Sequence, residues 1–376
     1  YEGNLTEGST FKVETEDLAV NFLGYRITGD AVIAGEVAPK EDGELESHVK
    51  LQYGSFGIAE AGTPPMVTGA GFAVDARSPD HALDQPFTAM SLVVDIPESS
   101  VPDFARFQGY MPVGVGFAVL GGSGKVRGNM RAEVPSDIAR GDLYLDGTGI
   151  RADFDGLLLD ADIGIQAHLQ KGSLTERRYD FAGSNLSIHR FEMVDPAVPG
   201  PKMVGDTNWS AKVWAKKGLA RIGADTYLDT DISMTCTNSV PFVAIVARHK
   251  PLAGWVQKLL SIPDVQGSAR LSLGLDSVYI RGLEIKGGQM EVLLDWLRKK
   301  KDNTATLFAR FGVLSLGVGV DGTERTIQVF KAREWHAERT GQVPAILPIA
   351  DGIEPERERP RKEAREAKKA RRQQGG

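Results

Sequence analysis

Two pairs of aspartates stand two residues apart in segments predicted to be strands, Asp160 with Asp162 and Asp229 with Asp231. Side chains two apart on a strand point to the same face, so each pair brings two carboxylates together. Such a pair can bind a cation or share acid and base roles in hydrolysis. Acidic side chains also keep the outer face of a sheet hydrated and oppose edge association. We favour this second interpretation.

The histidines predict no metal centre. No HExxH motif occurs and no two histidines stand at metal-ligand spacing. His168 lies on the polar side of its predicted strand, which indicates a solvated residue. The six are His48, His81, His168, His189, His249 and His336.

Other catalytic signatures are incomplete. Residues 121–126 (GGSGKV) resemble a phosphate-binding loop, but Val119 stands where that motif needs its first glycine and Val126 where it needs Ser or Thr. No GxSxG nucleophile motif occurs. Cys236 lies on the apolar side of its segment, as a small core residue does. We therefore expect neither an enzyme nor a cofactor.

Strict alternation of apolar and polar residues dominates the chain. Residues 159–169 are apolar at every odd position and polar or glycine at every even one. This period is typical of a half-buried strand, here longer than the usual five or six residues. The same period recurs at 228–236, 271–276 and 314–320, and it is shorter around 213–216. The apolar positions predict that the sheet has one continuous apolar face. The residues expected to line it are Leu159, Ala161, Ile163, Ile165, Leu228, Ile232, Met234, Leu271, Leu273, Leu275, Leu314, Leu316 and Val318.

Turn residues punctuate this pattern and predict antiparallel hairpins. The dipeptides are Asp146-Gly147, Asp155-Gly156, Asp321-Gly322, Gly29-Asp30 and Lys171-Gly172. Little helix-period sequence separates the segments, so parallel crossovers are not expected. The predicted fold is mainly β, a long antiparallel meander that forms a curved, groove-like or half-open sheet.

Two short amphipathic helices are expected within the meander. Residues 99–110 begin with serine and an early proline and space Phe104, Phe107 and Tyr110 along one side. Residues 241–262 carry a stripe that includes Leu252 and Val256. Residues 289–301 fit a helix or a strand paired with residues 307–320, and we favour the strand.

The same pattern gives one elongated domain, residues 1–351, with loose repeats at about 9–195 and 206–335. Residues 352–376 form a basic tail, in which residues 354–376 have no apolar residue larger than alanine or proline, and this composition predicts disorder. Three alternatives stay open for the tail, which are contact with nucleic acid, with anionic lipid head groups or with nothing in particular.

Charge and cysteine content narrow the function. The net charge is −6, and the tail holds nine Lys/Arg against five Asp/Glu, so the body is acidic and nucleic-acid binding is not expected there. One cysteine excludes an internal disulfide framework. No run approaches the ~20 apolar residues of a membrane-spanning helix. The first residue is Tyr1, so any amino-terminal signal or anchor would be missing from this sequence.

A sheet with one apolar face cannot leave that face in water, and two short helices are too few to cover it. Lipid acyl chains, such as those of phospholipids, are the expected cover. The first alternative is a structural or adhesive β-sandwich or β-solenoid whose apolar face packs on itself. The second is a polysaccharide-processing protein that uses the aspartate pairs.

The sequence resembles the AsmA-like group of bacterial envelope proteins, relatives of TamB and of the repeating β-groove, bridge-type lipid carriers. The resemblance lies in residues 101–112 (VPDFARFQGYMP) followed by 120–128 (LGGSGKVRG), in the long strands of 142–169, and in 308–318 (FARFGVLSLGV). It covers residues 9–335. It implies a periplasmic lipid-transport protein that serves outer-membrane homeostasis, with an inner-membrane anchor absent from this chain, partner envelope proteins and no catalytic residues.

Overall fold

The structure of the chain is a computed structural model. It describes residues 5–22, 24–40, 42–79, 89–110, 117–154, 156–173, 175–196, 204–205, 208–221, 226–241, 243–244, 261–274, 277–299 and 302–341. The predicted tail, 352–376, and most of the predicted helix 241–262 lie outside these residues.

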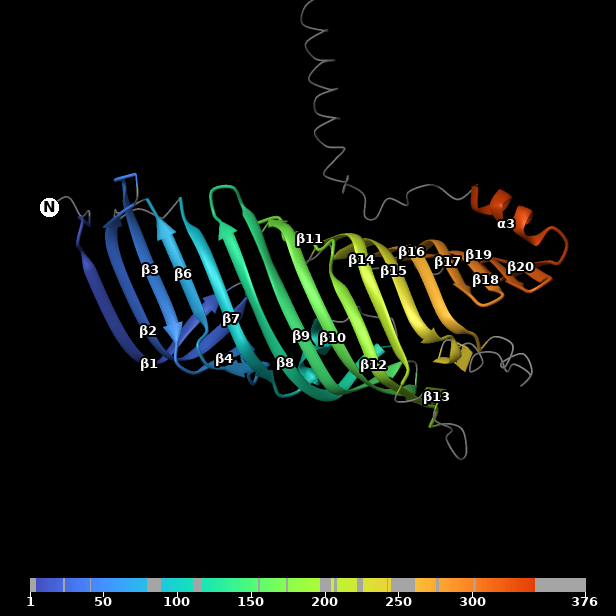
Figure 1. The fold of residues 1–376 in the computed structure, drawn as a ribbon, viewed down its shortest axis with the longest axis horizontal. Coiled ribbons are helices and arrows are strands. Elements are labelled where there is room, and N and C mark those ends of the chain that lie inside the picture. The colour runs from blue at the N-terminus through green and yellow to red at the C-terminus, as the bar shows by residue number, and fades with distance from the viewer. Residues whose placement is uncertain are drawn as a thin grey trace, which may run out of the picture.

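All strands of the described chain belong to one 21-stranded sheet, in which every pairing is antiparallel (Figure 1). The predicted mainly β, antiparallel meander is thus confirmed. The strands are β1 Thr10–Phe22, β2 Tyr25–Pro39, β3 Leu45–Tyr53, β4 Phe56–Glu60, β5 Val67–Gly69, β6 Ala73–Ser78, β7 Ser91–Val101, β8 Phe117–Glu133, β9 Ile138–Phe154, β10 Leu157–Ser173, β11 Arg178–Asp180, β12 Asn185–Val194, β13 Val204–Gly205, β14 Ser210–Arg221, β15 Tyr227–Asn238, β16 Pro263–Gly274, β17 Ser277–Gly287, β18 Met290–Lys299, β19 Asp302–Phe311, β20 Leu314–Asp321 and β21 Glu324–Gln328.

The strands follow one another across the sheet nearly in chain order. β3 and β4 pair with successive parts of β2, so together they act as one interrupted strand. β6 and β5 continue each other in the same way beside β3 and β4, and β11 and β12 do so beside β10. In Figure 1 the strands therefore stand side by side from β1 at one end of the molecule to β20 near the other.

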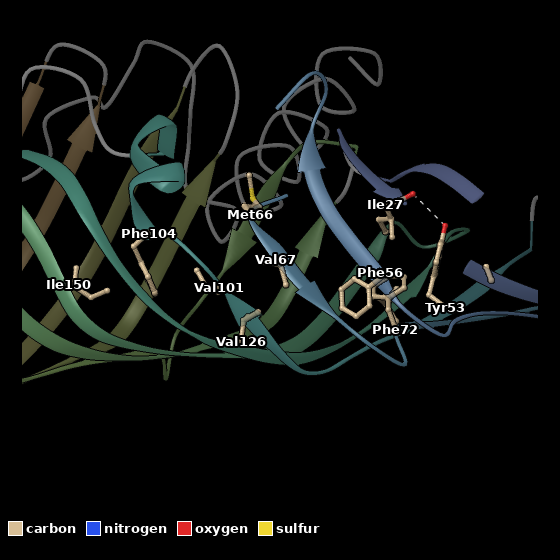
Figure 2. Close-up of a cluster of buried hydrophobic side chains, with 12 residues drawn as sticks. Ile27, Tyr53, Phe56, Met66, Val67, Phe72, Val101, Phe104, Val126 and Ile150 are labelled. Atoms are coloured by element: carbon tan, nitrogen blue, oxygen red, sulfur yellow. Dashed lines mark hydrogen bonds between the residues drawn. The ribbon is translucent and has the colours of Figure 1, made fainter. Parts of the chain in front are cut away.

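The amino-terminal half of the sheet bends sharply across its strands. Tyr53 is the register partner of Ala31, yet its hydroxyl donates to the carbonyl of Ile27, at 3.5 Å (Figure 2). Four residues of extended strand span about 13 Å, so a flat sheet would keep these groups apart. Irregularities in neighbouring strands meet along this line, between Thr15 and Leu18 in β1, at Gly54-Ser55 between β3 and β4, and between Ile96 and Ser99 in β7. We call the side toward which the sheet closes the inner face and the opposite side the outer face.

Glycine permits the close approach at the bend. Gly29 in β2 has φ +153° and faces the backbone of Ser55, such that a Cβ on Gly29 would stand 2.0 Å from the Ser55 carbonyl oxygen. The predicted Gly29-Asp30 turn is wrong, because these residues lie inside β2. Asp146-Gly147 and Lys171-Gly172 likewise lie inside β9 and β10 rather than at turns.

The remaining predicted turns lie between strands. Gly156, with φ +80°, separates β9 from β10, and Asp321-Gly322 joins β20 to β21, with Gly322 at φ +59°. Glycine therefore occurs both in the turns between strands and at irregular positions inside long strands. The residues around a glycine do not distinguish a hairpin turn from a bulge inside a 17-residue strand.

The helices agree in part with expectation. η1, Phe104–Tyr110, is a 3-10 helix within the predicted 99–110 segment. Residues 240, 241, 243 and 244 are helical, and the rest of the second predicted helix is outside the described chain. Residues 290–299 form β18, paired with β19, as the favoured interpretation of 289–301 required.

A helix that the sequence did not predict, α3 (Ala332–Gly341), packs on the outer face of β19 and β20. The ring of Trp335 lies over Gly317 and Gly319, where any Cβ would crowd it. Arg333 forms an ion pair with Glu291 at 3.0 Å beneath the helix. The His336 side chain is buried, and its Nε2 is the one buried side-chain nitrogen or oxygen in the described residues without a hydrogen-bond partner.

We expect Gly29→Ala to lower the free energy of unfolding by roughly 2 kcal/mol or more, because the new Cβ meets backbone that cannot move without opening the bend. Gly109→Ala is the matched control, since a Cβ there meets no atom within 4 Å. Urea denaturation of both variants tests this, and equal stabilities would contradict the steric argument.

Acidification should weaken the docking of α3. Burial lowers the pKa of His336 from its ordinary value of 6.5, with Arg333 adding to the decrease and Asp295 and the Thr306 backbone opposing it. As the pH falls, His336 is therefore protonated in the unfolded chain before it is protonated in the folded one. The stability that comes from the buried neutral His336 is complete above pH 6.5 and is lost as the pH falls below that value. Thermal unfolding between about pH 8 and pH 5 should show a smaller loss of stability in His336→Gln than in the wild type. Identical pH profiles would contradict this assignment.

Candidate ligand-binding face

Strand register makes the inner face apolar across the carboxy-terminal half of the sheet. Residues that are direct partners on adjacent strands point to the same face. One row of direct partners runs from β9 to β20 and contains only aliphatic residues, methionine and one glycine. Its members are Leu145, Ile165, Leu186, Val213, Met234, Gly267, Ile285, Val292, Ala309 and Leu316.

A second row continues the inner face across the amino-terminal half, from β1 to β10. It consists of Val13, Ile33, Leu51, Val74, Val94, Met130, Gly141 and Leu169. Both rows meet on β9, where Gly141 and Leu145 are four residues apart and so share a face. The described strands thus carry one apolar surface from β1 to β20.

The predicted lining residues follow this surface wherever they are described. Ile165, Met234 and Leu316 belong to the first row, and alternation places the others beside these residues on β10, β15, β16 and β20. Leu159, Ala161, Ile163, Leu228, Ile232, Leu271, Leu273 and Val318 are buried or half-buried, whereas Leu314 is 70% exposed and Leu316 38%. Leu275 lies outside the described residues.

Around β18 the two faces show an unusual distribution of burial. The polar Glu291 and Asp295 are 3% and 8% exposed on the outer face, where α3 packs. On the inner face of the same strand, Val292, Leu294 and Trp296 are only half-buried. The protein therefore buries these two carboxylates more completely than the apolar side chains on the inner face of the same strand.

The inner face forms an apolar cavity of about 480 Å³ at the bend, partly open to solvent. One wall comes from the segments folded back across the sheet, with Ile27, Ile58, Met66 and Phe107, and the other comes from β7 to β10. Residues from these strands include Val94, Met130, Leu143, Leu145, Ala167 and Leu169. Cavities of this size are common for ligands of small-molecule size, and an apolar one gives water few partners.

The cavity was not predicted from the sequence. Only its β10 wall belongs to a segment whose alternation we used, and Ala167 and Leu169 lie there rather than among the predicted lining residues. β4 and β5 contribute short segments of five and three residues, in which no period is readable, and η1 contributes Phe107 from the predicted helical segment. Their meeting depends on the bend, which local sequence does not reveal.

Beside the cavity the protein seals part of its own apolar surface. Tyr53, Phe72 and Val101 are at most 1% exposed and form a cluster with Phe56 and Phe104 (Figure 2). Edge and tilted ring contacts join Phe72 to Tyr53 and to Phe56, with centroids 5.9 and 5.4 Å apart. A second, smaller cluster contains Trp209, Cys236, Ile262 and Val265. The inner face is thus sealed in two places and half-open between and beyond them.

The aspartate pairs lie on the outer face, where Asp162, Asp229 and Asp231 form ion pairs. Asp162 accepts from the Arg190 guanidinium and from the Gly149 backbone N–H, and the bond to Arg190 is the main cause of its lowered pKa. Asp229 is bound by Arg270 at 2.6 Å and by the Ser272 hydroxyl at 2.8 Å. These partners give Asp162 and Asp229 a structural function on the outer face.

The other candidates for chemistry have similar surroundings. His168 pairs with Asp142 at 2.6 Å on the outer face, and Lys125 of the glycine-rich segment lies within β8 and pairs with Glu98 at 2.5 Å. Within the described residues, no group of three histidine, cysteine or acidic side chains is arranged to hold a metal ion.

No helix of the described chain is long and apolar enough to span a membrane. Comparisons with protein-family models, curated proteins and solved structures gave no match.

Cys236 should resist thiol reagents in the folded protein. Burial raises the pKa of its thiol to about 11, so almost no thiolate forms near neutral pH. We expect modification by a disulfide reagent at about pH 8 to be slow in buffer and fast in denaturant. Equal rates in both would place the thiol in contact with solvent.

Proposed function

We propose that this protein is a non-catalytic lipid-binding protein that holds acyl chains along its inner face. The observation that carries the proposal is the apolar surface that adjacent strands maintain from β1 to β20. Acyl chains suit such a surface because they are long, flexible and free of hydrogen-bonding groups. Their contacts would be non-directional, so a chain could slide without breaking specific bonds.

The energetic case rests on the half-open part of the inner face. Apolar surface transferred from water gains about 25 cal/mol per Å², so covering about 400 Å² is worth on the order of 10 kcal/mol. Exposed apolar patches larger than a few hundred Å² usually mark a binding surface. α3 packs on the outer face, where Glu291 and Asp295 are buried, whereas Trp296 on the inner face of the same strand is only half-buried. The inner face is therefore the side of β18 with apolar surface left for a ligand, which supports this assignment.

The cavity at the bend is the best-defined place for a chain. Both of its walls are apolar, and it lies on the same face as the open surface. We propose that one acyl chain occupies it while the polar head group remains in water. Phospholipid is the expected class.

The alternative is a structural or adhesive protein whose apolar face packs on itself, as in a β-sandwich. The sealed cluster around Tyr53 and Phe72 favours it locally. The described strands, however, form one sheet rather than two facing sheets. Bound lipid separates the two functions, because self-packing needs none.

The cellular setting rests on the resemblance to AsmA-like envelope proteins. On that basis we propose a periplasmic protein in lipid transport, anchored to the inner membrane by a segment outside this sequence and working with other envelope proteins.

Leu169→Asp should weaken lipid binding at least about tenfold, since it places a carboxylate in the wall of the cavity. Titration with a fluorescent fatty acid measures the effect, and native mass spectrometry detects phospholipid that copurifies with the wild type. Gln170→Asp is the matched control, because Gln170 is exposed, adjacent in β10 and not part of the cavity.

Circular dichroism must show that both variants keep the sheet. Equal affinity of the two variants would refute the assignment of the cavity. Wild-type protein that carries no lipid and takes up no fatty acid would refute the proposed function itself.

A further inference from the structure

The outer face contains a second hollow, of about 520 Å³, where β10, β12, β14, β15 and β16 adjoin. Its side chains are mainly hydroxyls and amides. Serine, threonine, asparagine and glutamine make up most of its polar lining, and His189, Lys212 and Asp264 are the titratable residues in it. Ala211, Cys236 and Val265 alternate with the polar residues and so belong to the inner side of the same strands.

Register arranges these polar residues in parallel rows across the strands. One row is Ser187, Lys212, Thr235 and Gln266, each the direct partner of the next. A row on one side is Asn185, Trp214, Ser233 and Ser268. On the other side His189 pairs with Ser210, which is hydrogen-bonded to Thr237. Hydrogen-bonding groups therefore repeat at the distance between strands, about 4.8 Å.

This composition differs from that of the outer face around it. On neighbouring parts of the same strands, carboxylates and guanidinium groups pair, as in Asp162–Arg190 and Asp229–Arg270. Inside the hollow, the side-chain hydrogen bonds are between neutral groups, from Asn185 to Gln166 at 2.8 Å and between Ser210 and Thr237 at 3.1 Å. Thr235 and Gln266 at the centre are exposed to solvent.

An aromatic ring borders the hollow. Trp214 is half-buried in the row with Asn185, and the Lys212 ammonium lies 5.3 Å from the centre of its ring. Lysine is flexible and strongly hydrated, so another group can replace it on the indole. The C–H face of a sugar ring is apolar and stacks on such a surface, while its hydroxyls need neutral donors and acceptors beside the ring.

We propose that this hollow binds a linear, β-linked glycan whose chain crosses the strands of the outer face. An extended β-linked chain repeats at nearly the interval between strands, so successive sugars would meet successive polar side chains of the central row, which are Ser187, Lys212, Thr235 and Gln266. The glycan is bound and not cleaved. This site is independent of lipid on the inner face, which leaves the two surfaces free to act at once.

Isothermal titration calorimetry or protein NMR with chitohexaose and cellohexaose tests the proposal, with the coiled, α-linked maltohexaose for comparison. Thr235→Ala combined with Gln266→Ala removes hydrogen bonds at the centre of the hollow and should weaken binding of the extended oligosaccharides about tenfold. Gln170→Ala combined with Lys216→Ala is the matched control, because both residues are exposed on β10 and β14 outside the hollow.

Binding of an extended oligosaccharide that the first double variant weakens and the control retains would support the site. No binding at millimolar concentration, equal loss in both double variants or a preference for maltohexaose would overturn it. Fatty-acid binding by the same proteins keeps this result separate from the proposed function, since neither pair of substitutions touches the cavity of the inner face.

Discussion

The structure depends on the agreement between side-chain alternation and strand register. Alternation alone gives each strand one apolar face and one polar face. Neighbouring strands could still place their apolar faces on opposite sides of the sheet, because a register shift of one residue moves every side chain to the other face. Here, nearly every pairing aligns apolar residues with apolar ones, as in Val213 opposite Met234 and Val292 opposite Ala309. Burial on one side fixes the register, and the fixed register keeps that side continuous. Both proposed binding surfaces depend on this alignment, because it also collects the polar residues on the outer face.

Bulges bend the long sheet so that its inner face forms a cavity. An extra residue in one strand interrupts the ladder and increases the local twist, which lets the sheet turn on itself. Gly29 permits the contact with Ser55 at the bend, and Asp17, in β1, takes the left-handed conformation, with φ +53°. The walls of the cavity come together only because of this bend. The carboxy-terminal strands lack an equally tight closure in the described residues, and there the inner face stays half-open.

Sequence reasoning predicted features that depend on neighbours along the chain. Strict alternation identified β10, β15, β16 and β20, and the apolar stripe of residues 290–299 fitted β18 once a partner strand was assumed. It failed where a feature depends on distant segments. Gly147 and Gly172 have the sequence context of turn residues but lie inside strands, since a bulge and a hairpin differ only in the path of the chain beyond the glycine. The docking of α3 on Gly317 and Gly319, and the rows of the outer hollow, need registers between strands that no local pattern contains.

The nearly sequential pairing of the strands also bears on how the molecule folds and how it varies in size. Each strand of the carboxy-terminal half contacts mainly the one before it and the one after it, as β15 contacts β14 and β16. Cooperativity in such an array passes between nearest neighbours, so assembly can nucleate locally and spread outward. Contacts close in sequence also favour rapid folding for a β-protein of this length. A hairpin gained or lost in evolution would lengthen or shorten the sheet while leaving the remaining strand-to-strand interfaces intact.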